Sequence, residues 1–141
     1  MKALILGAML TVSCQVLAEN EPALDAIQEY LEFAEYSDGA IMPEQLASID
    51  SKDILYVDAR NAERYNAGHI PGAINIEWRQ ILERRDEIPK DKSVVLYCDT
   101  GLSSSRAYFI LRLAGRENIK VLRGGYLMWK EHRQQSMKAG D

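Results

Sequence analysis

Short apolar segments alternate with amphipathic ones along most of the chain, and this alternation constrains the fold more than any other feature. Residues 94–97 are apolar without interruption, and so are residues 54–57. A strand buried on one face alternates apolar and polar residues, whereas a strand covered on both faces is apolar throughout. The pattern therefore predicts an α/β fold of three layers, with a mostly parallel central sheet flanked by helices on both faces.

The predicted elements follow one another in β–α order. Strands are expected at residues 40–42, 54–57, 73–76, 93–97 and 120–122. Helices are expected at residues 43–49, 61–66, 78–87, 104–114 and 126–135. Ligands of such sheets bind at the carboxyl ends of the strands. Cys98 directly follows the most apolar strand, so it lies where a ligand is expected.

The first eighteen residues differ in character from the rest. Lys2 is their only charge, residues 3–10 are apolar, and Ala18 ends the segment. This pattern predicts a secretory signal peptide at 1–18, cleaved near Ala18, and a periplasmic or secreted protein. The apolar run is too short for a permanent transmembrane helix. A lipoprotein lipidated at Cys14 is the alternative, and a buried N-terminal helix is less favoured.

An acidic segment follows the predicted signal peptide. Residues 19–38 contain seven acidic residues and no basic one, with apolar residues at helical spacing. They predict an amphipathic helical extension whose acidic face is solvated, or alternatively docks a basic partner protein. Residues 39–135 then form the single main domain, and residues 136–141 a C-terminal tail.

Charge and cysteine content narrow the function. A formal net charge of −4 excludes the basic surface of a nucleic-acid-binding protein. Once the signal peptide is removed, Cys98 is the only thiol left, which in an exported chain indicates reactive chemistry or intermolecular pairing. An inert buried cysteine is the alternative. One cysteine with His69 and His132 does not make a zinc site, so neither a metal nor a cofactor is expected.

The loop after Cys98 is suited to hold a thiolate. Gly101 permits a positive φ, and successive inward-facing amides form an anion-binding nest. A helix beginning near Ser103 and Ser104, with one of them as its N-cap, adds the positive end of its dipole. We therefore expect a lowered pKa and a nucleophilic sulfur. The predicted binding loop comprises Asp99, Thr100, Gly101, Leu102, Ser103 and Ser104.

Three sequence blocks together resemble the rhodanese family. They are residues 56–60 with the Gly-His-Ile-Pro-Gly-Ala block at 68–73, residues 98–103, and residues 122–126 followed by Trp129. The resemblance implies a rhodanese-like fold and a thiosulfate sulfurtransferase-like enzyme. In this family the loop cysteine, here Cys98, takes the outer sulfur of a donor such as thiosulfate. The resulting persulfide passes it to cyanide or a thiol.

Departures from the family pattern bear on the donor. Ser104 stands six positions after Cys98, where related phosphatases have arginine, so the sequence favours sulfur transfer over phosphatase activity. Ser103 replaces a common arginine, and Asp99 is acidic, which weakens the field that attracts thiosulfate. Arg60 and Arg106 are candidate anion-binding residues, and either could compensate for this loss. For Arg106 the alternative is a solvated side chain without a role in binding. The alternative function is a non-enzymatic persulfide carrier or partner-binding module. The remaining motif residues are expected to be structural: Asp58, His69, Trp78, Tyr126 and Trp129.

Overall fold

The computed structural model describes residues 21–35 and 39–140 of the chain. Its strands form one five-stranded sheet, in which every pairing is parallel and the order is β1-β5-β4-β2-β3. The strands are β1 (Ala40–Ile41), β2 (Ile54–Asp58), β3 (Ile74–Asn75), β4 (Ser93–Tyr97) and β5 (Ile119–Leu122). The helices are α1 (Glu21–Phe33), α2 (Pro43–Leu46), α3 (Ala62–Ala67), α4 (Leu102–Leu113) and α5 (Gly125–Ala139). The predicted α/β class is confirmed.

Each face of the sheet carries its own apolar core, which explains the uninterrupted apolar strands. In β4, Val94 and Leu96 pack into a cluster with residues of α4, including Leu111. Val95 and Tyr97 point to the opposite face, into a cluster that includes residues of α2 and α5. Strand β4 is therefore covered on both sides, and its carboxyl end lies at the middle of the sheet.

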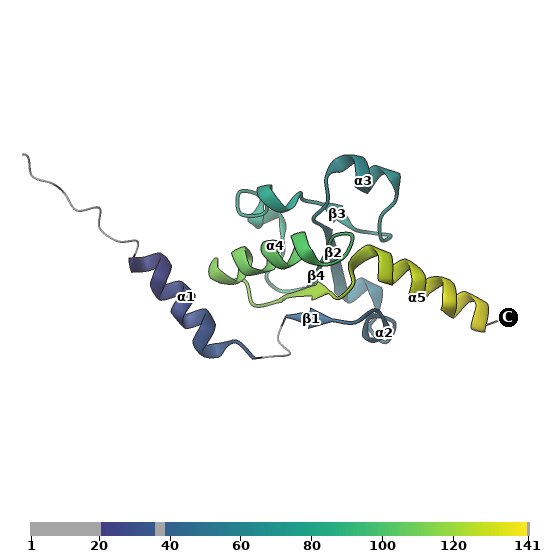
Figure 1. Cartoon of the computed structure of the whole chain (residues 1–141), viewed down its shortest axis with the longest axis horizontal. Coiled ribbons are helices and arrows are strands. Elements are labelled where there is room, and N and C mark those ends of the chain that lie inside the picture. Colours follow the sequence, from purple (N-terminus) through teal and green to yellow (C-terminus); the bar gives the residue numbers. More distant parts are fainter. Residues whose placement is uncertain (1–20, 36–38, 141) are drawn as a thin grey trace, which may run out of the picture.

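Helix α1 lies within the predicted acidic extension and packs on the main domain through an aromatic contact. The ring of Tyr30 meets that of Phe109 in α4 edge-on, with centroids 5.2 Å apart. Figure 1 shows α1 at one end of the molecule and α5 at the other. Among the described residues no helix is long and apolar enough to cross a membrane. The predicted signal peptide, including Cys14 and Ala18, lies outside the described residues.

The predicted helix at residues 78–87 is wrong. Two short 3-10 turns stand there instead, η2 (Trp78–Gln80) and η3 (Arg85–Glu87). The guanidinium of Arg116, itself buried, donates to the carbonyl oxygens of Ile88 and Arg85 at 3.0 and 2.9 Å. Arg116 thus supplies hydrogen bonds to backbone carbonyls that a continuous helix would otherwise bond internally. The segment can therefore adopt an irregular backbone.

Three other helices differ by two residues or more from their predicted bounds. Helix α2 ends at Leu46, three positions before the expected end. Helix α4 begins at Leu102, two positions before the expected start, and α5 continues to Ala139, into the segment predicted as a tail. In α5 the hydroxyl of Ser136 donates to the carbonyl of His132 at 3.0 Å, so the segment after residue 135 continues the helix. A third 3-10 turn, η1 (Ser51–Asp53), precedes β2.

Candidate active site

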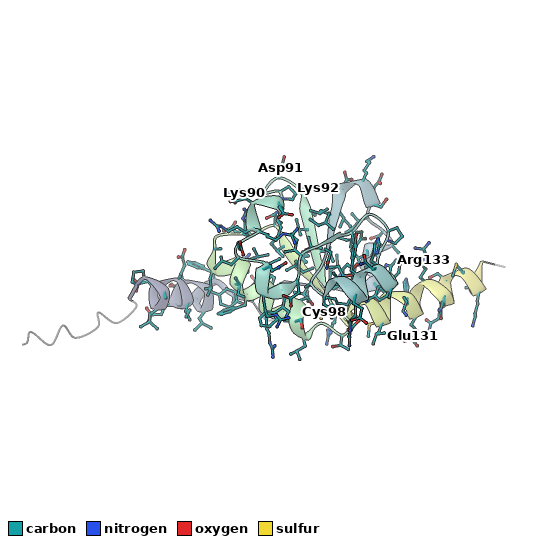
Figure 2. The ribbon with its side chains drawn as sticks, turned by 90° about the horizontal axis from the view of Figure 1, so that it is seen from above. Lys90, Asp91, Lys92, Cys98, Glu131 and Arg133 are labelled. Atoms are coloured by element: carbon teal, nitrogen blue, oxygen red, sulfur yellow. The ribbon has the colours of Figure 1, made fainter. Side chains whose placement is uncertain are left out.

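Cys98 lies at the carboxyl end of β4, and the start of α5 fixes the backbone of its loop. The N–H of Tyr126 donates to the carbonyl of Cys98 at 2.8 Å, and that of Leu127 to the carbonyl of Asp99 at 3.2 Å. This approach requires a glycine at 125, since a Cβ there would lie 2.6 Å from the carbonyl carbon of Asp99. Figure 2 shows Cys98 on the opposite side of the molecule from residues 90–92.

The sulfur of Cys98 is surrounded by hydrogen-bond donors of its own loop. The N–H of Gly101 lies 3.2 Å from Sγ, and the hydroxyl of Ser104 lies 3.5 Å from it. Burial opposes ionisation of the thiol, but hydrogen bonds from Ser104 and from the amides of Thr100 and Gly101 outweigh it. The pKa of Cys98 is therefore lowered from its ordinary value.

The start of α4 differs from the capping arrangement that we predicted. Gly101, not Ser103 or Ser104, is the N-cap, with φ of 109°, and the structure shows no side-chain cap at this end of the described helix. Ser104 lies within the first turn of the helix, where its hydroxyl donates to the carbonyl of Gly101 at 3.0 Å. A serine cap would need extended backbone at residue 103, whereas the glycine lets the chain turn into the helix earlier.

A cavity of about 320 Å³ opens over Cys98. Of the predicted loop residues, Asp99, Thr100, Leu102 and Ser103 line it, while Gly101 and Ser104 contact the sulfur from behind. The complete lining is Ala59, Arg60, Asn61, Arg64, Glu77, Trp78, Arg79, Cys98, Asp99, Thr100, Leu102 and Ser103. The cavity is large enough for a small sulfur compound.

Arg60 lines the cavity, but most of its donors are engaged with the protein. Its Nη2 lies 2.6 Å from Asp58 Oδ2 and 2.7 Å from the carbonyl oxygen of Gly68. Its guanidinium also lies over the ring of Tyr126, 4.4 Å from the centroid. Only Nη1 points to the loop, where it lies 3.3 Å from Asp99 Oδ1. The structural role expected of Asp58 is thus the pairing with Arg60.

Arg106 is not brought to the cavity. Its guanidinium stacks over the indole of Trp78, 5.3 Å from the ring centroid, and only Trp78 of this pair belongs to the lining. His69 also lies outside the lining. Its Nδ1 is 2.9 Å from the carbonyl oxygen of Tyr65, and the two rings are stacked, as expected for a residue that holds the turn.

Two cavity arginines were missed by the sequence analysis. Arg64 extends from α3 and forms an ion pair with Asp99, and Arg79 of η2 pairs with Glu77 at 3.0 Å. Both are exposed residues in charged segments, so local periodicity gives no signal. The available signal was positional, because α3 and η2 follow β2 and β3 at the edge of the sheet where ligands bind.

Fold and site together define a class: an α/β domain with a cysteine at the carboxyl edge of a parallel sheet, its sulfur held by loop amides. The family model described as "Rhodanese-like domain" matches residues 42–132. The chain belongs to the rhodanese-like domain family, as the three sequence blocks predicted. This finding confirms the resemblance.

Relatives of this chain include enzymes named for sulfur transfer. It is 39% identical to a sulfurtransferase from Allochromatium vinosum, over 59% of this chain and 78% of the relative. It is 30% identical to the thiosulfate sulfurtransferase GlpE from Coxiella burnetii, over 60% of this chain and 78% of the relative. A relative from Mycobacterium tuberculosis, an HTH-type transcriptional regulator, is 34% identical over 87% of this chain, which spans only 55% of its length.

A solved structure shows the same fold. The rhodanese-related protein from Thermoplasma volcanium superposes with a TM-score of 0.61 at 27% identity, covering 66% of this chain and 91% of its own. At family level the chain thus belongs with the rhodanese-type sulfurtransferases.

Proposed function

We propose that the protein transfers a sulfane sulfur from a donor such as thiosulfate to a thiophilic acceptor, cyanide or a thiol, through a persulfide on Cys98. The observation that carries the proposal is the position of Sγ. Cys98 lines the cavity, and its Sγ lies 3.2 Å from the N–H of Gly101 and 3.5 Å from the hydroxyl of Ser104. A thiolate in this environment is stabilised without a general base.

The proposed reaction has two steps and needs no redox partner. In the first, the Cys98 thiolate attacks the outer sulfur of thiosulfate, the S–S bond of the donor breaks, and sulfite leaves with the electron pair. In the second, the acceptor attacks the outer sulfur of the persulfide, and the Cys98 thiolate is released. Cyanide becomes thiocyanate. Such covalent catalysis predicts ping-pong kinetics.

The loop amides would act in both steps. The negative charge stays near the same site as it passes from the thiolate to the outer sulfur of the persulfide. Preorganised N–H groups stabilise such a charge without reorganising, and burial of Cys98 strengthens their effect. The persulfide would therefore survive until an acceptor enters the cavity.

Intact mass spectrometry tests this proposal. The purified protein should gain one sulfur atom on incubation with thiosulfate and lose it to cyanide, with thiocyanate as product. The Cys98→Ser variant should gain none, and its thiocyanate production should fall by about a thousandfold or more. Turnover that survives in Cys98→Ser would exclude the persulfide mechanism.

The second candidate is a persulfide carrier or partner-binding module without thiosulfate turnover. The observation that favours it is the pairing of Asp99 with Arg60 and Arg64, which takes positive charge away from an anionic donor. In that case the mass experiment would show a free, alkylatable Cys98 after thiosulfate. Sulfur would then load from a protein donor, and the acidic extension is the candidate docking surface for it.

We also propose that the protein is exported. The support is the charge and hydropathy pattern of residues 1–18, together with the single thiol that remains after their removal. Expression of the full chain followed by cell fractionation should place it outside the cytoplasm, with a mass that corresponds to cleavage near Ala18. Lipidation would show as a membrane-bound form that Cys14→Ser releases. Retention of the uncleaved chain in the cytoplasm would contradict export.

A further inference from the structure

The charges around Cys98 are nearly balanced before a donor enters. The ionised side chains of the cavity lining, apart from the thiol, are three guanidiniums and two carboxylates: Arg60, Arg64, Arg79, Glu77 and Asp99. Beyond the lining, the carboxylate of Asp58 pairs with Arg60, and the guanidinium of Arg106 stacks over Trp78, so these two charges offset each other. The Cys98 thiolate then adds a negative charge of its own. A dianion entering this cavity meets no excess of positive charge.

Asp99 is the carboxylate whose removal would change the net charge of the cavity. Its two oxygens face different arginines, Arg60 and Arg64. Removal of the charge at 99 would leave Arg60 in place, because Asp58 and the carbonyl of Gly68 also hold it. The side chain of Arg64 is 61% exposed and would be released from its partner, so its charge would become available to a ligand.

We propose that Asp99 is a specificity-determining residue, which neutralises Arg64 and so favours organic persulfides over the thiosulfate dianion as sulfur donors. The inference rests on the proposed function. A persulfide of a small thiol such as cysteine carries less negative charge than thiosulfate in total. The specificity therefore follows from the charge of the donor, not from its size.

The transfer from a persulfide balances without an added oxidant or reductant. The Cys98 thiolate attacks the outer sulfur of R–S–SH, and a new S–S bond forms. The S–S bond of the donor breaks, and its electron pair leaves on R–S⁻, which takes a proton from water. The protein then carries the same Cys98 persulfide that thiosulfate would give.

The test compares kcat/KM for thiosulfate and for cysteine persulfide in three proteins. These are the wild type, Asp99→Asn and the control Asp91→Asn, whose exposed side chain lies on the opposite side of the molecule from Cys98 (Figure 2). Asp99→Asn should raise kcat/KM for thiosulfate about tenfold and that for cysteine persulfide, which carries about half the net charge, about threefold. Added salt should lower the thiosulfate value more steeply in Asp99→Asn than in the wild type.

A second variant identifies the cation. Arg64→Gln added to Asp99→Asn should remove the gain with thiosulfate. An unchanged ratio of the two donors in a folded Asp99→Asn, or a gain that persists without Arg64, would overturn the inference. Either result leaves the proposed function standing if Cys98 still gains sulfur in the mass experiment. Failure of the wild type to gain sulfur from either donor would instead refute the proposed function.

Discussion

The hydroxyl of Ser104 lies between two acceptors, 3.5 Å from the sulfur of Cys98 and 3.0 Å from the carbonyl oxygen of Gly101. A hydroxyl has one proton to donate. It can bond the carbonyl while Cys98 is a thiol and turn to the sulfur once Cys98 ionises. Ser104 therefore contributes to the low pKa of Cys98 by stabilising the charged form.

Ser104→Ala should raise the pKa of Cys98, because it removes a hydrogen bond that stabilises the thiolate. The thiolate is the reactive form, so its population rises as the pH passes upward through the pKa. The variant should thus react up to about tenfold more slowly below its pKa and equally fast well above it. The measurement is the rate of alkylation by iodoacetamide as a function of pH.

Ser105→Ala is the matched control for this prediction. Its hydroxyl also donates to the carbonyl of Gly101, at 2.8 Å, but the side chain is exposed and its bond goes to the carbonyl instead of the sulfur. The midpoint of its alkylation profile should coincide with that of the wild type. A profile of Ser104→Ala with the wild-type midpoint would show that the loop amides alone set the pKa.

Features of this site that depend on neighbouring residues in the sequence could be predicted, and features that depend on residues far apart in the chain could not. Strand β4 was predicted because burial on both faces requires an uninterrupted apolar run, a local signal. The start of α4 was missed because its cap is a glycine and Leu102, its first residue, is 65% exposed, so neither capping nor periodicity marks it. The irregular segment at 78–87 depends on Arg116, a residue far along the chain.

In the cavity, too, a locally marked residue could be predicted and the long-range contacts could not. Cys98 could be identified because a motif and a strand end coincide there. The ion pairs of Asp99 could not, because they join two separate segments of the chain at an edge that exists only in the folded sheet. The acidity of Asp99 was visible in the sequence as a departure from the family pattern. Its pairing with Arg60, just after β2, and with Arg64, on α3, was visible only in three dimensions.

Gly125→Ala should impair sulfur transfer through the loop backbone. Gly125 has φ of 60°, and a Cβ there would meet the carbonyl groups of Cys98 and Asp99, neither of which is a flexible side chain. The loop would have to shift, and displacements of about 1 Å cost roughly a hundredfold in rate. The expected loss of thiocyanate production is at least about tenfold.

Gly72→Ala is the control that introduces backbone strain without a clash of the new Cβ. Gly72 also has a positive φ, of 80°, but a Cβ there would meet nothing within 4 Å. Both variants should lose some thermal stability, since alanine is strained in this conformation. Only Gly125→Ala should lose activity beyond its loss of folded protein. Equal activity of the two variants would rule out the fixation of the loop by α5.

Arg60→Ala should strongly destabilise the fold. Asp58 is fully buried and receives three side-chain hydrogen bonds from Arg60, at 2.6, 3.0 and 3.1 Å. Truncation would leave a buried carboxylate without its partner, which costs about 3–5 kcal/mol. Urea unfolding followed by circular dichroism measures the loss. The double variant Asp58→Asn, Arg60→Met should recover much of the lost stability, because no uncompensated charge then remains.

Lys52→Ala is the control, since it breaks an exposed pair with Asp50 and should leave the unfolding midpoint nearly unchanged. A midpoint for Arg60→Ala close to that of Lys52→Ala would mean that water reaches Asp58 and that the buried pair does not support the sheet edge beneath Cys98.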